Sequence, residues 1–117
     1  MISKELLSAV YPIDETTETY VGIQESTGRV MWFGKEYNDC RSEIDIHRVA
    51  HKCKLWALNE GYYLRAEQGI NYKDNLMWTC FLNKDMNDGA EFVDYWNITE
   101  PEAIFKACQW ILDKDSK

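Results

Sequence analysis

The sequence predicts an α+β fold: an antiparallel sheet of about five strands, two longer helices packed on one face, and a short N-terminal helix. Two observations support this prediction. Three stretches start with a cap-forming residue directly after an isoleucine and continue with apolar residues at helical spacing. Five other stretches are rich in β-branched and aromatic residues and are separated by turn-forming residues. The expected element order is α-β-β-α-β-β-β-α, in a single domain over residues 1–117.

The three helix starts share one design. Ser3, Asp45 and Thr99 can each accept a hydrogen bond from a backbone N–H of the first helical turn. The isoleucine before each cap can pack on the residue five positions later; the pairs are Ile2 with Leu7, Ile44 with Val49, and Ile98 with Ala103. Thr99 and Glu102 also match the reciprocal capping pattern, and Pro101 in the first turn loses no intrahelical bond. The predicted helices cover residues 4–10, 46–60 and 100–113.

The strands lie between these helices. Residues 20–25 and 29–33 flank Ser26-Thr27-Gly28 and predict a hairpin, and the polar residues 34–43 predict a loop that ends in a short extended piece. Gly61 is a natural residue to end the second helix. The remaining strands cover residues 62–68, 76–83 and 90–96, separated by the turn-rich segments GINYKDN and KDMNDG.

Residues 45–113 therefore have the element order of a double-stranded-RNA-binding domain, but they lack its charge. The whole chain carries a net charge of −7, of which residues 1–45 contribute −5. That family places basic residues at the start of its last helix to bridge phosphates, and here Thr99-Glu100-Pro101-Glu102 occupies this place. Because phosphate binding needs Lys and Arg to displace counterions, we expect no nucleic-acid binding. The acidity is compatible with solubility, with a basic protein partner, or with imitation of nucleic acid.

The sequence shows no catalytic or metal-binding motif. The four cysteines contain no close pair, which favours free thiols in a reducing cytoplasm over a disulfide framework or a zinc site. His47 and His51 have the spacing of a zinc protease helix, but Arg48 stands where the catalytic glutamate is needed. NKDMNDG fits neither register of a calcium-binding loop, and no phosphate-binding or nucleophile motif is present. We expect no metal, no cofactor and no catalytic residue.

Membrane and secretory segments are not expected either. No stretch approaches the ~20 apolar residues of a membrane span. The start, MISKELLSAV, lacks the apolar run of a signal peptide. The chain is therefore predicted to act in the cytoplasm, away from membranes.

The second helix carries two apolar stripes. The predicted core face consists of Ile46, Val49, Ala50, Cys53, Trp56 and Ala57. On the opposite side, His47, His51, Leu55 and Leu58 form a weaker second stripe. Either the first 45 residues fold over this stripe or a partner docks on it, and we expect the former, with Leu55 mostly buried within the monomer.

The last helix adds one residue to the candidate surface. Its predicted core residues are Ile104, Ala107, Cys108, Ile111 and Leu112. Its wet face consists of Glu102, Lys106, Gln109 and Asp113, with Trp110 at the edge. The candidate partner surface therefore comprises His47, His51, Leu55, Leu58 and Trp110.

Two stretches resemble known proteins. Residues 46–64, with AHKCKLWALNEGYYL, and residues 100–112, EPEAIFKACQWIL, are similar to small uncharacterised proteins encoded by phages and prophages of Gram-negative bacteria. This resemblance covers about a third to a half of the chain and rests on caps, core cysteines and tryptophans. It implies a phage or prophage origin and a cytoplasmic site of action, and it carries over no functional residue.

Together these observations favour a non-enzymatic accessory protein that binds a host or phage protein through an acidic and aromatic surface. Inhibition of a nucleic-acid-handling enzyme by DNA mimicry is one version of this function. Two alternatives stay open. One is an enzyme whose site is built from scattered carboxylates with His47 or His51, and the other is a structural homo-oligomer.

Overall fold

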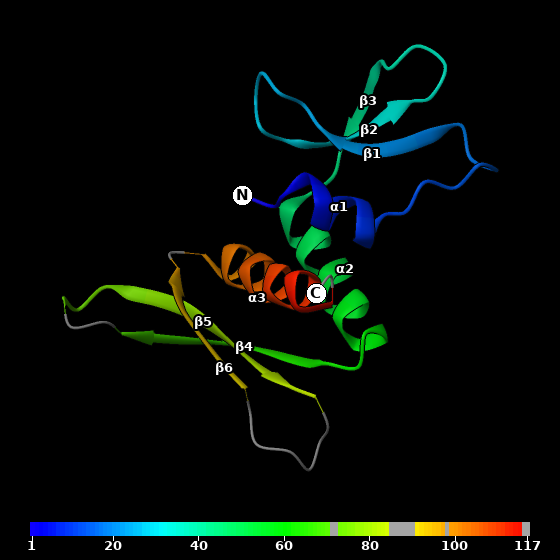
Figure 1. Ribbon diagram of the computed structural model, residues 1–117. Coiled ribbons are helices and arrows are strands. Elements are labelled where there is room, and N and C mark those ends of the chain that lie inside the picture. Colours follow the sequence, from blue (N-terminus) through cyan, green and yellow to red (C-terminus); the bar gives the residue numbers. More distant parts are fainter. Residues whose placement is uncertain (71–72, 85–90, 98, 116–117) are drawn as a thin grey trace.

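The computed structural model describes residues 1–70, 73–84, 91–97 and 99–115, and it has an α+β fold (Figure 1). The described helices are α1 (Lys4–Val10), α2 (Ile46–Asn59) and α3 (Glu100–Asp115). The described strands are β1 (Thr19–Ile23), β2 (Val30–Gly34), β3 (Cys40–Glu43), β4 (Tyr63–Ile70), β5 (Leu76–Asn83) and β6 (Glu91–Asn97). Ile98 and parts of the turns predicted at 69–75 and 84–89 lie outside the described residues.

The strands form two antiparallel sheets, so the prediction of a single sheet of about five strands is wrong. One sheet has the order β1-β2-β3 and the other the order β4-β5-β6. The helices lie between them (Figure 1). Residues 40–43, predicted as a short extended piece, pair with β2 and complete the first sheet. α2 then carries the chain from the first sheet across the helical layer to β4, and the second sheet lies against α3.

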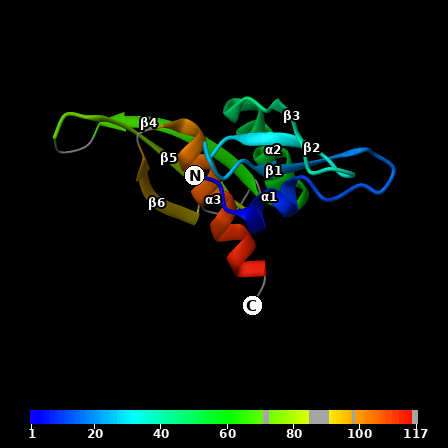
Figure 2. The same ribbon diagram turned by 90° about the horizontal axis from the view of Figure 1, so that it is seen from above.

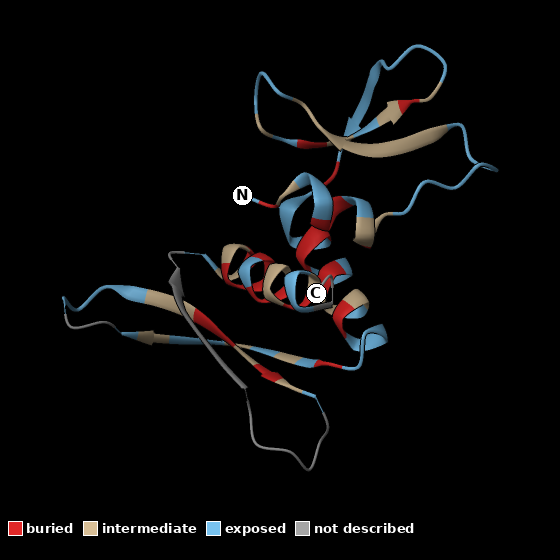
Figure 3. Ribbon diagram, viewed as in Figure 1, coloured by how far each residue is buried: buried red, intermediate tan, exposed pale blue. Residues whose placement is uncertain are grey.

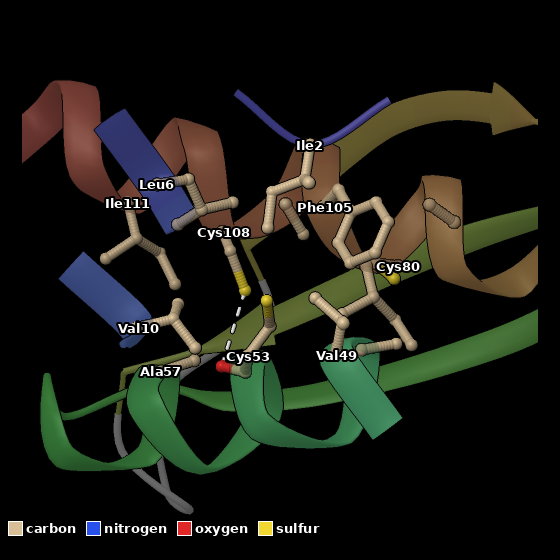
Figure 4. Packing of buried hydrophobic residues seen from close by; sticks show 14 of the residues in the cluster. Ile2, Leu6, Val10, Val49, Cys53, Ala57, Cys80, Phe105, Cys108 and Ile111 are labelled. Atoms are coloured by element: carbon tan, nitrogen blue, oxygen red, sulfur yellow. Dashed lines mark hydrogen bonds between the residues drawn. The ribbon is translucent and has the colours of Figure 1, made fainter. Parts of the chain in front are cut away.

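α3 is the central element of the core. It contacts α1, α2 and all three strands of the second sheet. Its buried residues are Pro101, Ala103, Ile104, Phe105, Ala107, Cys108 and Ile111. Figure 4 shows Leu6 and Val10 of α1 and Cys53 of α2 around Cys108 and Ile111. Burial is concentrated in the helical layer and in the strand segments that face it (Figure 3).

The three predicted N-terminal caps are confirmed. Ser3 Oγ accepts from the Leu6 N–H at 3.1 Å, and Asp45 Oδ1 accepts from the His47 N–H at 2.9 Å. Thr99 Oγ1 accepts from the Glu102 N–H at 3.3 Å. At the far end of α2, Gly61 has a φ of 92°, the left-handed conformation that glycine adopts at little cost.

Candidate interaction site

The second stripe of α2 is exposed, so the prediction that the first 45 residues bury Leu55 is wrong. Leu55 is 47% exposed and Leu58 48% exposed, and His47 and His51 also face solvent. The reason is the length and course of α1. Its seven residues extend ~10 Å, and after Pro12 the chain leaves the helices to reach β1. The N-terminal segment therefore covers only one flank of α2.

Trp110 does not join this stripe. Its ring packs edge-on against the ring of Tyr62, with centroids 6.1 Å apart, and Lys114 Nζ lies 4.7 Å from the Trp110 ring centroid. Tyr62 is buried and Trp110 half-buried. Trp110 thus closes the core at the point where the chain leaves α2, and the structure does not bring it together with the four stripe residues.

The two histidines line a small pocket between α2 and the start of α3. The pocket holds about 210 Å³, and Lys54 and Glu100 also line it. Lys54 Nζ lies 3.7 Å from Glu100 Oε1, so the only carboxylate in the lining already has a cationic neighbour. Among the described residues, no group of three or more His, Cys, Asp or Glu side chains is placed to hold a metal ion. The enzyme alternative would place its chemistry in this pocket.

The two leucines line a different and larger hollow. This hollow holds about 500 Å³ and is lined by Ala9, Val10, Pro12, Lys52, Leu55, Trp56, Leu58 and Asn59. Its walls come from the end of α1 and from the C-terminal half of α2. Trp56, predicted as a core residue, is only half-buried: it packs against the core and also lines this hollow.

A second hollow continues it toward the first sheet. It holds about 250 Å³ and is lined by Val10, Tyr11, Pro12, Asp14, Thr17, Thr19, Tyr20, Val21, Trp32 and Lys52. Val10, Pro12 and Lys52 line both hollows, so the two are adjacent. We call them together the α1–α2 groove.

Four of the described aromatic residues line the groove: Tyr11, Tyr20, Trp32 and Trp56. The rings of Tyr11 and Trp32 meet edge to face with centroids 6.2 Å apart, and Lys52 Nζ lies 5.8 Å from the Tyr11 ring centroid. Burial raises the pKa of the Tyr11 phenol above its ordinary value. The sequence pattern of α2 indicated Leu55 but missed Tyr11 and Trp32. These two come from other elements, and periodicity within one helix cannot reveal them.

The rim of the groove is acidic. Asp14 lines it, and Glu15 and Glu18 are exposed on the same loop. The hydroxyl and the backbone N–H of Thr16 donate to Asp14 Oδ1 at 2.6 and 2.9 Å and lower the pKa of this carboxyl below its ordinary value. Lys35 Nζ donates to the carbonyl oxygen of Asp14 and ties the loop to the first sheet. The hydrogen bonds from Thr16 therefore favour the charged form of Asp14.

The cysteines offer no activated nucleophile in the core. Cys53, Cys80 and Cys108 are buried, and Cys40 is exposed. Burial raises the pKa of Cys80 to about 12. The Cys108 thiol donates to the carbonyl oxygen of Cys53 at 3.5 Å (Figure 4), and its contact with Cys53, together with burial, raises its pKa as well. Thiols held neutral in this way pack like small apolar side chains.

No family model, curated protein or solved structure matches this chain. No described helix is both long enough and apolar enough to cross a bilayer.

Proposed function

We propose that this chain is a small non-enzymatic accessory protein that binds another protein by holding an apolar, positively charged segment in the α1–α2 groove. The lining of the groove carries the proposal. Tyr11, Trp32 and Trp56 border it together with the half-exposed Leu55 and Leu58. Aromatic side chains surrounded by a polar rim are typical of the centre of a protein–protein interface.

Charge supports a basic partner. The chain carries −7, and the loop at the groove's rim carries Asp14, Glu15 and Glu18. The groove lining also contains a cation, the Lys52 ammonium, which lies 5.8 Å from the Tyr11 ring centroid. A segment with lysines or arginines would be attracted to this rim, while its apolar residues would occupy the groove. Proteins that handle nucleic acid carry such basic surfaces, and inhibition by DNA mimicry is therefore one version of the proposal.

The origin and place of action belong to the same proposal. The resemblance of residues 46–64 and 100–112 to phage and prophage proteins supports a cytoplasmic accessory protein whose partner is a host or phage protein. The hollow beside Leu55 and Leu58 lies along a helix, and an amphipathic helix is the peptide conformation that matches such a surface.

Two peptides of opposite charge test the chemistry of the partner. One is an amphipathic helix of lysine and leucine, and in the other glutamate replaces every lysine. We expect the basic peptide to bind and to change the NMR signals of the Trp32 and Trp56 indoles, which border the groove. Equal binding of both peptides, or changes confined to other tryptophans, would contradict the proposal.

Variants then test the surface. Leu55→Glu is expected to weaken binding of the basic peptide about tenfold or more, because a charge replaces a leucine that the peptide would bury. Leu76→Glu is the matched control, since Leu76 is a 60% exposed leucine on β5, outside the groove. In capture from a lysate of the natural host, the partner should be retained by the parent and by Leu76→Glu and lost from Leu55→Glu. Loss from both, or from neither, would show that the groove is not the binding site.

The same capture experiment distinguishes the groove proposal from the enzyme alternative. His47 and His51 line a different pocket from the leucines, so replacing both histidines with alanine should leave partner capture unchanged. Loss of capture from this double variant would place the interface at the pocket that the histidines line.

A further inference from the structure

β4 forms an edge of the second sheet. All eight of its residues pair with β5 on one side, from Tyr63 opposite Asn83 to Ile70 opposite Leu76. In the described strand order β4-β5-β6, β4 is terminal, and Figure 2 shows it at the margin of the sheet. An edge strand presents a row of backbone N–H and C=O groups that can pair with another strand. Natural edges are often protected by proline or by charged side chains; YLRAEQGI contains no proline, and its two charged residues, Arg65 and Glu67, form an ion pair with each other.

When two copies of one strand pair antiparallel, the two-fold axis that relates them runs perpendicular to the sheet. One residue of each strand then lies directly opposite the same residue of the other strand. With Ala66 facing Ala66 of a second copy, Arg65 of each chain lies opposite Glu67 of the other. Arg65 and Glu67 are both exposed, and within one chain Arg65 Nε lies 3.0 Å from Glu67 Oε1. The paired edges would then carry four charges of alternating sign, and opposite charges on facing residues stabilise a strand pair.

The same register gives Tyr63 a suitable partner. It places Tyr63, which is 47% exposed, opposite Gly69 of the second copy. An aromatic ring facing an edge glycine covers backbone that glycine leaves bare. Leu64 comes to lie opposite Gln68. A shift of the axis by one residue would put Arg65 opposite itself or Glu67 opposite itself, which is unfavourable. Charge therefore selects the register centred on Ala66.

We propose that two copies of this chain associate through β4, antiparallel about Ala66, so that their three-stranded sheets join into one sheet of six strands. Because the axis is perpendicular to the sheet, α3 of both copies lies on the same face. No residue of β4 lines the α1–α2 groove, so this association neither requires nor blocks the proposed function.

Charge exchange between the two positions tests the register. Sedimentation equilibrium of the parent should show a reversible dimer with twice the monomer mass of 13.8 kDa. Arg65→Glu and Glu67→Arg should each weaken the dimer about tenfold, because each brings like charges to face one another twice. The double variant R65E/E67R restores opposite charges and should restore the dimer. Arg41→Glu is the matched control, since Arg41 lies on the edge strand β3 and forms a similar ion pair with Asp39 at 3.3 Å.

A parent that stays monomeric at every concentration would overturn the proposal. So would a dimer that the double variant fails to restore, or one that Arg41→Glu weakens equally. A measurement on the parent alone tests the proposal even if the variants fold poorly. Amide hydrogen exchange in β4 should slow as the protein concentration rises, whereas exchange in β3 should not. A dimer with unchanged exchange in β4 would place the contact elsewhere.

Discussion

Burial decides which of the four cysteines can react. Cys40 on β3 is exposed, while Cys53, Cys80 and Cys108 are enclosed by the helices and β5. We expect iodoacetamide to label Cys40 alone in the folded protein at neutral pH and all four cysteines in urea, as counted by mass spectrometry. Raising the pH to about 9, where an ordinary thiol is largely ionised, should not add Cys80, because its pKa is about 12. Labelling of a second cysteine without unfolding would contradict this packing.

Single residues also show which structural features the sequence pattern predicts and which it does not. Three helix caps were predictable, because a cap depends on a side chain and a backbone N–H two or three residues away. Exposure was less predictable, because it depends on distant elements. Ile46 lies on the predicted core face of α2 yet is 40% exposed, since it stands in the first turn and lines an open pocket with residues at the ends of β2 and β3.

Among the elements, α1 depends most on its neighbours. Seven residues are too few for a stable isolated helix, yet Leu6, Leu7 and Val10 are buried. We expect Leu6→Ala to cost about 3 kcal/mol of unfolding free energy, because Leu6 is fully buried against α3 (Figure 4). Urea unfolding followed by circular dichroism measures this change.

Two comparisons control that prediction. Leu55→Ala should cost less than about 1 kcal/mol, because Leu55 is half-exposed on α2. Trp56→Ala should fall between the two, since its ring is half-buried; the sequence alone predicts a severe loss of stability for this variant. Equal costs for Leu6→Ala and Leu55→Ala would mean that α1 is not docked as described.

The pairing of strands was the part of the fold that the sequence could not supply. Stretches rich in β-branched and aromatic residues between turn-forming residues indicated the strands, and their bounds agree within a few residues, for example 76–83 for β5. Such a stretch fits one sheet or two, because it indicates an extended segment and not which strand is its neighbour. The short polar β3, with four exposed residues, was predicted only as an extended piece, and its pairing with β2 was not predicted.

On the scale of the whole molecule, the two sheets on opposite sides of the helices make the chain elongated. Its radius of gyration is 15.5 Å and its extents are 47 × 32 × 22 Å. A compact chain of this length would have a radius near ~13 Å. The α1–α2 groove lies where the first sheet meets the helical layer, which explains why its residues come from β1, β2, α1 and α2. A site assembled from four elements follows from the fold and could not be found in any one segment.

Because of this position, a ligand in the groove would connect separate parts of the fold. A ligand that fills both hollows would contact the first sheet at Val21 and Trp32 and α2 at Leu55, so it would tie these parts together. At a concentration of about 100 times its Kd, a ligand that binds only the folded protein adds about 2.7 kcal/mol to the unfolding free energy. We therefore expect the basic amphipathic peptide to raise the melting temperature and to slow amide exchange in β1 and α1, as well as in α2. The acidic peptide should do neither at the same concentration. Protection confined to α2, with exchange in β1 unchanged, would mean that the segment occupies the leucine hollow alone and that the aromatic hollow beside Tyr11 is not part of the interface.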